Sequence, residues 1–379
     1  MQAPLRVLLA LRPTVAPALL VAVASSTVVF VSTPFILPAV AAEYGVSVGT
    51  AGLISASQLA GFVAASWFGG RFLHPVRSVF VVGTLLGVFA NLASAAAPNF
   101  EVLTATRLVS GISLGLAAWF AWQDAFGDAG KTGDVAVVGP LVGMVVAPVV
   151  SALIETIGVN GVFLVLAAVA ATPLLFVAGV SAHNELRPHR TRHAATRAAR
   201  AILVALGIVT LGGSSVFVYG AAIGTEANGM SALTVSLIYS ANAVASIPAA
   251  KWYGPRGPAG VWFVGTAVCA FSIAGVRSPV VFSVALIGWG FVFFMGVPAA
   301  FGLLAARSNF PEERAGDAQA VMALGRVFGP LLGGVFIGAG EFGWLAVVSA
   351  SILTLAGGTL LFVDRRRFVV ERGRVHLRR

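Results

Sequence analysis

Residues 13–42 read PTVAPALLVAVASSTVVFVSTPFILPAVAA and carry no charged side chain between Arg12 and Glu43. A helix that spans a bilayer core needs about 20 apolar residues, so this run is long enough to cross a membrane. Ala39-Val40-Ala41 has the A-x-A spacing of a signal-peptide cleavage site. The apolar region of a signal peptide is only about 7–15 residues long, however, so we predict that this run is a membrane helix and is not cleaved off.

The composition extends this interpretation to the whole chain. Hydrophobic residues make up 58% of the 379 positions and charged residues only 10%, against about 25% in soluble domains. Disorder is excluded, because it needs low hydrophobicity and high charge. A disulfide-built scaffold is excluded, because Cys269 is the single cysteine. An integral membrane protein remains.

Eleven further runs between charged residues have the length of a membrane helix, which gives twelve predicted transmembrane helices. Only the fourth and eleventh runs contain a charged residue inside, and in both it is an arginine. The further runs are residues 44–70, 78–100, 102–123, 135–154, 156–184, 201–225, 227–250, 257–276, 278–306, 318–340 and 342–363.

The charge of the loops differs between the two sides of the membrane. If the N-terminus is cytoplasmic, 21 of the 24 basic residues fall on the inner side and only Arg277 falls on the outer side. Inner loops rich in Lys and Arg are typical of membrane proteins, so we predict that both termini are cytoplasmic and that the chain lies in the plasma membrane. The same distribution explains the net charge of +10 without nucleic-acid binding.

Four regions follow from this count. We predict an N-terminal six-helix bundle at 1–181, a basic cytoplasmic linker at 182–200, a C-terminal six-helix bundle at 201–364 and a basic tail at 365–379. The linker contains three histidines, which we interpret as part of a solvated basic segment rather than a metal or pH-sensing site: His183, His189 and His193. The tail is expected to contact anionic membrane lipid.

The two halves share sequence patterns. Trp67-Phe68-Gly69-Gly70-Arg71 is matched 185 residues later by Trp252-Tyr253-Gly254-Pro255-Arg256. Gly139-Pro140-Leu141-Val142-Gly143 is matched 190 residues later by Gly329-Pro330-Leu331-Leu332-Gly333. Repeated halves are typical of transporters that work by alternating access, so we predict two pseudo-symmetric bundles.

These patterns resemble the major facilitator superfamily over nearly the whole chain. The resemblance rests on four stretches in order: Gly69-Gly70-Arg71 to Arg77, Arg107-x3-Gly111-x3-Gly115, Gly139-Pro140-x2-Gly143 and Gly158 to Phe163. It implies an all-α fold of twelve transmembrane helices in two six-helix bundles, and it is closest in kind to bacterial drug or metabolite efflux members. It also implies a conformational role for Gly69, Arg71, Arg77, Gly139 and Pro140, and for the matching pair Gly329 and Pro330.

Two features depart from the family pattern. Leu73-His74-Pro75 stands where the loop after the second helix normally holds an acid. The full Gly-x3-Gly-Pro-x2-Gly-Gly pattern lies at 325–334 in the eleventh helix, whereas the fifth-helix copy ends Gly143-Met144. The antiporter motif of the family belongs to the fifth helix, so the second departure weakens that assignment.

The candidate substrate-binding residues are charged, polar or aromatic groups at membrane depth. Arg107 and Arg326 are the foremost, because an intramembrane charge is costly and usually faces a cavity or a partner. For Arg107 the alternative is a structural bond to backbone or to Glu155. The remaining candidates are Gln58, Tyr219, Tyr239, Asn242 and Trp289, and for Gln58 and Asn242 the alternative is a bond to a neighbouring helix.

No Asp or Glu falls at mid-membrane, although proton-coupled carriers usually place one there. Coupling would then use Asp124, Glu155, a proton carried by the substrate, or no ion at all. The chain holds no metal-ligand cluster, no nucleotide-binding loop and no catalytic triad, so we predict no cofactor and no enzymatic activity.

The predicted function is a secondary transporter of a small organic solute, with export preferred, the proton as candidate coupling ion and a monomer as the working form. Two alternatives stay open. The first is uptake or exchange of an organic anion held by Arg107 and Arg326. The second is a transporter-like receptor that binds a partner without moving solute.

Overall fold

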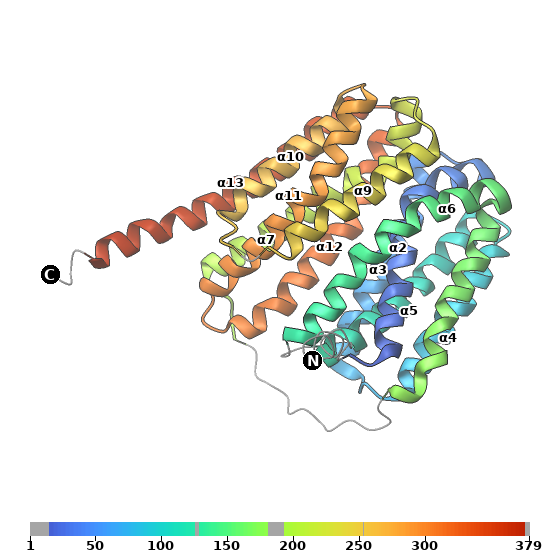
Figure 1. The fold of residues 1–379 in the computed structure, drawn as a ribbon, viewed down its shortest axis with the longest axis horizontal. Coiled ribbons are helices and arrows are strands. Elements are labelled where there is room, and N and C mark those ends of the chain that lie inside the picture. Colours follow the sequence, from blue (N-terminus) through green and yellow to red (C-terminus); the bar gives the residue numbers. More distant parts are fainter. Residues whose placement is uncertain (1–14, 126–128, 181–192, 253, 376–379) are drawn as a thin grey trace, which may run out of the picture. The chain divides into compact units, whose positions relative to one another are not determined.

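A computed structural model describes residues 15–125, 129–180, 193–252 and 254–375 (Figure 1). Throughout these residues the chain is helical and contains no strand. Ten of the described helices are long and apolar enough to cross a membrane, and residues 259–275 form a shorter apolar helix. The prediction of an all-α membrane protein is therefore confirmed, while the count of twelve crossings and the side of the termini stay predictions.

The helices follow the predicted runs in order. The first half contains α2 (Pro17–Tyr44), α3 (Val48–Phe72), α4 (Arg77–Ala95), α5 (Phe100–Ala125), α6 (Ala129–Ala171) and the 3₁₀-helix η1 (Thr172–Gly179). The second half contains α7 (Arg197–Phe217), α8 (Gly220–Ala222), the π-helical turn η2 (Ile223–Ala227), α9 (Ala232–Ala250), α10 (Ala259–Gly275), α11 (Pro279–Ala306), α12 (Pro311–Gly338) and α13 (Phe342–Val375). Helix α7 thus begins inside the segment predicted as linker, and α13 continues into the predicted tail.

Helix α6 is interrupted at Gly158, where the backbone has φ 68° and ψ 176°. These angles are open to glycine and strained for other residues, so the helix cannot continue through this position. No atom lies within 4 Å of the place where a Cβ would stand, so the backbone angle rather than crowding requires glycine here. The break separates the two apolar runs that the sequence predicts as successive helices.

The chain forms two compact units that do not coincide with its two halves. The first comprises the described residues of 1–32 and 57–188, and the second those of 33–56 and 189–379. The C-terminal part of α2 and the N-terminal part of α3 therefore pack with α7 to α13. The predicted bundles, 1–181 and 201–364, differ from these units because they assign residues 33–56 to the first half.

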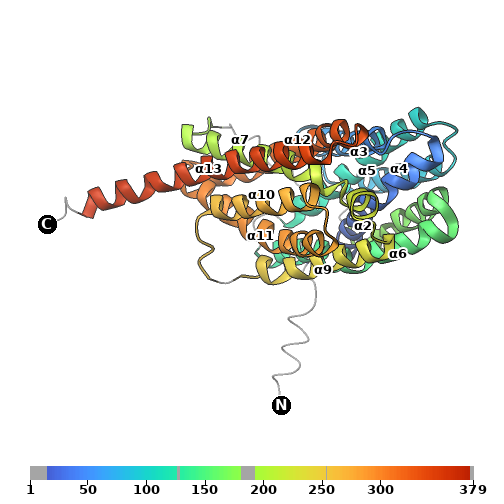
Figure 2. The same cartoon turned by 90° about the horizontal axis from the view of Figure 1, so that it is seen from above.

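Glycines let helices meet backbone to backbone in both units. In the first unit, Cβ atoms on Gly111 and Gly115 would collide with the carbonyl oxygens of Gln58 and Phe62 on α3. In the second unit, Gly325 of α12 packs in the same way on α7, and α10 packs on α13 at Gly260 (Figure 2). Small residues at such contacts are the usual means of close helix packing in lipid.

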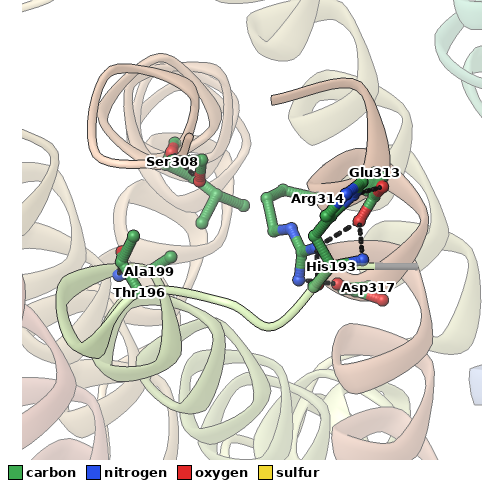
Figure 3. A network of polar contacts seen from close by, with 8 residues as sticks. His193, Thr196, Ala199, Ser308, Glu313, Arg314 and Asp317 are labelled. Atoms are coloured by element: carbon green, nitrogen blue, oxygen red, sulfur yellow. Dashed lines mark hydrogen bonds and ion pairs between the residues drawn. The ribbon is translucent and has the colours of Figure 1, made fainter. Parts of the chain in front are cut away.

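An ion-pair network holds the N-terminus of α12 to the segment before α7 (Figure 3). Glu313 accepts hydrogen bonds from the backbone N–H of His193 and lies 2.9 Å from its Nδ1. Arg314 binds Glu313 at 2.6 Å, Asp317 at 2.7 Å and the carbonyl of His193 at 2.6 Å. His193 also stacks on Phe310 with ring centroids 3.7 Å apart. His193, predicted to belong to a solvated linker, is thus docked on α12, whereas His183 and His189 lie outside the described residues.

We predict that Glu313→Gln weakens this network in a pH-dependent way. The hydrogen bonds from His193 hold the pKa of the Glu313 carboxyl below its ordinary value. A carboxyl with a lowered pKa stabilises the folded state above its ordinary pKa, and the benefit is lost as the pH falls through the lowered value. In thermal melts of the detergent-purified protein, the variant should melt about 1–2 °C lower at pH 7, because Arg314 keeps its ion pair with Asp317 when residue 313 is neutral.

The difference between wild type and Glu313→Gln should shrink as the pH falls below the ordinary carboxyl pKa of about 4.3 and the native carboxyl becomes protonated. Glu341→Gln, which removes an exposed carboxylate at the other end of α12, is the matched control. A difference that is constant over this pH range would contradict the assignment.

Candidate functional site

Arg107 of α5 is held entirely within the first unit and is only 2% exposed. Its Nε and Nη2 atoms lie 3.1 and 2.6 Å from the hydroxyl oxygen of Ser94, and Nη2 also donates to the side-chain oxygen of Asn91 at 2.9 Å. Both acceptors belong to α4. The guanidinium carbon lies 4.7 Å from the centre of the Phe163 ring on α6. Arg107 therefore ties three helices together, and Glu155, the predicted alternative partner, is exposed and absent from these contacts.

Gln58 lies at the contact between α3 and α5 and is 4% exposed. Its backbone carbonyl faces Gly111, and its side-chain Nε2 finds no hydrogen-bond partner among the described residues. An unsatisfied amide is costly in a low-dielectric environment, so this nitrogen is a candidate contact for a polar solute atom.

Helix α7 breaks inside its apolar span. The α-helix ends at Phe217, the N–H of Tyr219 turns back to the carbonyl of Val216, and the chain continues through α8 into the π-helical turn η2. The break leaves the carbonyl of Phe217 without a helical partner, and the hydroxyl of Tyr239 on α9 donates to it at 2.6 Å. Irregular helices at membrane depth are typical of transporter binding sites.

Four aromatic side chains gather at this break, and we call them the α7 aromatic cluster: Phe35, Phe217, Tyr239 and Trp289. The ring of Tyr239 meets Phe35 edge-on at 5.2 Å and Phe217 at 5.1 Å, and Phe217 lies 5.9 Å from Trp289. Three of the rings are at most 6% exposed, and Phe217 is partly exposed. The rings of the cluster pack mainly on one another, and Phe217 is the member that stays partly accessible.

Two other predicted polar residues of the second unit serve the packing of its helices. Asn242 of α9 donates to the carbonyl of Leu286 on α11 at 2.6 Å. Tyr219 is fully buried, and its hydroxyl donates to the carbonyl of Pro330 at 2.7 Å, with the carbonyl of Gly49 at 3.3 Å. The contact of Asn242 corresponds to the predicted alternative of a bond to a neighbouring helix, and Tyr219 is engaged in the same way.

Arg326 of α12 differs from Arg107 in its exposure and in its partners. Its side chain is exposed, and it makes no hydrogen bond or ion pair with any residue that the structure describes. Pro330, four residues later, has no N–H to give to the carbonyl of Arg326, so the helix is weakened at this turn. The sequence thus predicted two comparable arginines, but only Arg326 has a guanidinium free to bind a solute.

The register of α12 separates Arg326 from the surface that faces lipid. The exposed apolar residues follow each other at intervals of four, three and four: Leu324, Phe328, Leu331 and Val335. Helical geometry places Arg326 more than 100° from the middle of this stripe and on one line with Gln319, seven residues earlier. Arg326 and the exposed Gln319 therefore form a polar edge beside the face that packs on α7.

The residues with a predicted conformational role lie in different surroundings. Gly69 packs against the indole of Trp119, and Arg77 donates to the carbonyls of Val180 and Ala178 at the end of η1, each at 3.0 Å. Asp124 and Glu155 are exposed on α5 and α6, and the side chain of Arg71 lies outside the described residues. Pro140 is buried inside α6.

Sequence reasoning missed Phe35 and Phe217. Phe35 reaches the α7 aromatic cluster because its part of α2 packs with the second unit. The signal that could have found it is the pair of prolines on either side, Pro34 and Pro38, which lack the N–H that a regular helix would use here. For Phe217 the signal is the run Gly212-Gly213-Ser214-Ser215, whose residues favour the helix weakly.

We predict that Arg107→Met destabilises the protein. The substitution removes the hydrogen bonds to α4 and leaves Asn91 and Ser94 short of a buried donor. The melting temperature of the purified protein should fall by roughly 5 °C or more. Arg277→Met is the control, because Arg277 is exposed and only lies over the ring of Phe342, and it should change the melting temperature little. Equal melting of Arg107→Met and wild type would show that the contacts described here do not stabilise the first unit.

The matched glycines Gly139 and Gly329 should respond differently to alanine. A Cβ on Gly329 would collide with the Ser214 hydroxyl and stand 2.8 Å from the carbonyl of Leu211, whereas a Cβ on Gly139 meets nothing within 4 Å. Gly329→Ala should therefore cost about 1–3 kcal/mol, and Gly139→Ala should be neutral or mildly stabilising. Melting temperatures of the two variants test this, and a loss of stability in Gly139→Ala alone would reverse the assignment.

Comparison with known proteins shows which family the sequence matches. The family model described as Major Facilitator Superfamily matches residues 18–324. The comparison with curated protein sequences finds no match.

Several solved transporters share the fold. A bacterial homologue of the human lysosomal transporter Spinster, in an inward-facing and occupied conformation, has a TM-score of 0.70 and 13% identity, over 96% of this chain and 97% of that one. The nucleoside transporter NupG has a TM-score of 0.66 and 13% identity, over 91% and 98%. The human organic anion transporter MFSD10 has a TM-score of 0.65 and 14% identity, over 92% and 100%. At these identities the likeness shows the fold alone, but the family match covers most of the sequence, and the chain belongs to the major facilitator superfamily.

Proposed function

We propose that this membrane transporter is a secondary transporter in the plasma membrane, which exports a small organic anion by alternating access. The observation that carries the proposal is the guanidinium of Arg326, which is exposed and unpaired among the described residues in the middle of a membrane helix. A guanidinium stays protonated and binds carboxylates and phosphates with two parallel hydrogen bonds. An unpaired guanidinium at this depth destabilises the protein, and an anionic solute that binds it offsets this cost.

The α7 aromatic cluster supports an organic rather than an inorganic anion. Its rings lie in the same unit as Arg326, and Tyr239 and Trp289 come from helices that pack against each other, α9 and α11. Aromatic faces bind flat apolar groups and interact weakly with a hydrated inorganic ion. One structure with this fold is an organic anion transporter, which agrees with the proposed substrate class.

The proposal also includes a direction of transport and a coupling ion. The Gly-Pro motifs of α6 and α12, which resemble those of efflux members, favour export over uptake, although the fifth-helix copy is incomplete. The proton is the first coupling ion to test, although none of the described Asp and Glu side chains lies in the middle of an apolar span. Transport that is indifferent to an imposed pH gradient would exclude proton coupling and leave exchange or uniport.

We predict that Arg326→Gln removes the transport of anions selectively. The wild type and the variant are reconstituted in proteoliposomes and tested with radiolabelled aromatic carboxylates and with their neutral carboxamides. A hydrogen bond to a charged group contributes about 1.5–3 kcal/mol, so the transport rate of carboxylates at low concentration should fall at least tenfold. Transport of any neutral solute that the wild type accepts should be unchanged.

Arg277→Gln is the matched control, since it removes an exposed arginine of the same unit that lies beside Phe342. Equal loss of carboxylates and carboxamides in Arg326→Gln would assign Arg326 to the conformational change rather than to the solute. Failure of the wild type to move any member of the panel would favour the receptor alternative.

A further inference from the structure

A groove of about 440 Å³ runs along the outside of the second unit between α7 and α13. Two arginines of α7, Arg197 and Arg200, form one end of it. The rest of its wall is made by Ala201, Val204, Ala205 and Ile208 on α7 and by Thr359 on α13. The two helices lie side by side, as Gly212 packed against Ile352 and Leu353 shows (Figures 1 and 2). None of these residues belongs to the proposed solute site.

The arginine end of the groove is a concentrated, unpaired positive charge. Arg197 and Arg200 are three residues apart on one face of α7, and both are exposed. The first turn of α7 contains no acidic residue, and neither arginine makes an ion pair with any described side chain. Two like charges at this spacing repel each other, and a phosphate between them would remove that cost.

The remainder of the groove is apolar and leads away from the arginines into the membrane span. Ala201, Val204 and Ile208 follow Arg197 at helical intervals, and Val204 is 59% exposed. On the opposite wall the hydroxyl of Thr359 donates to the carbonyl of Leu355 in its own helix at 2.9 Å, so its hydrogen is not offered to the groove. Leu355 beside it is 66% exposed. Such a surface suits a hydrocarbon chain and offers little to a polar solute.

The walls of the groove are fixed to each other by hydrogen bonds. At the arginine end, Thr196 donates to the carbonyl of Arg307 at 2.7 Å, and Arg307 donates to the carbonyl of Val363 on α13 at 3.0 Å. Further along, the hydroxyls of Ser215 on α7 and Ser349 on α13 are 2.7 Å apart. A groove that is already formed costs a ligand little reorganisation.

We propose that this groove is a binding site for an anionic phospholipid. The headgroup phosphate lies between Arg197 and Arg200, and one acyl chain lies along Val204 and Ile208. The order of the surface, from positive charge to apolar wall along the axis of a membrane helix, matches the order of a lipid from headgroup to chain. A zwitterionic lipid carries the same phosphate, but its added positive charge is repelled by the two arginines, so the site selects lipids with net negative charge.

The test is the thermal stability of the full-length, detergent-purified protein with added lipid. Phosphatidylglycerol should raise the melting temperature of the wild type in a saturable way, because a ligand that binds the folded state stabilises it. Phosphatidylcholine should raise it much less. In the double variant Arg197→Gln, Arg200→Gln, the concentration of phosphatidylglycerol needed for half of the effect should rise roughly tenfold or more, at about a fivefold loss per arginine.

Two controls separate the site from general effects. Lys251→Gln removes an exposed cation at the end of α9 and should leave the response to phosphatidylglycerol unchanged. Val204→Trp fills the apolar wall and keeps both arginines, so it should also weaken the response. An equal response of wild type and double variant would overturn the proposal, as would inorganic phosphate that stabilises the wild type as well as the lipid does. Because stability is measured without transport, the outcome is independent of the proposed substrate.

Discussion

The structure depends on the need to satisfy every backbone polar group inside lipid, where no water is available. Continuous helices meet this need by themselves, and each departure from a regular helix needs a side chain to complete it. At the break in α7, the hydroxyl of Tyr239 binds the carbonyl of Phe217, and Gly220 leaves the space for that hydroxyl to approach. The hydroxyl of Tyr219 binds the carbonyl of Pro330 on α12 in the same way. The irregular part of α7 is thus held by two tyrosines that the sequence shows only as polar residues at depth.

The same constraint explains how much the sequence could predict. Hydrophobicity and charge determine which segments cross the membrane, so the runs 13–42 and 318–340 can be assigned by counting. The helical boundary at Gly158 follows from local backbone preferences. The packing of residues 33–56 with the second unit does not follow, because it depends on contacts such as Gly49 against Gly334, and glycines in membrane helices are too common to reveal their partners.

The candidate site was predictable only at the level of residue types. Arg107 and Arg326 look alike in the sequence, since each is a lone arginine in an apolar run. What separates them is the neighbouring helix. Helix α4 presents Asn91 and Ser94 to Arg107, whereas no helix in the described structure presents an acceptor to Arg326. A partner on another helix cannot be read from spacing along the chain, so the sequence could not decide which arginine is available.

The contrast between the arginines suggests how one unit can combine packing and binding. On α12 the small residues Gly325, Gly329 and Gly333 face α7, and they bring the two backbones so close that no long side chain fits between them. Arg326 follows directly after Gly325, so the place of its backbone is fixed by a contact in which its side chain takes no part. A charge held in this way needs no ion pair to position it, and its donors stay available. The rigid contact between α7 and α12 therefore both maintains the fold and presents the group on which the proposed substrate class depends.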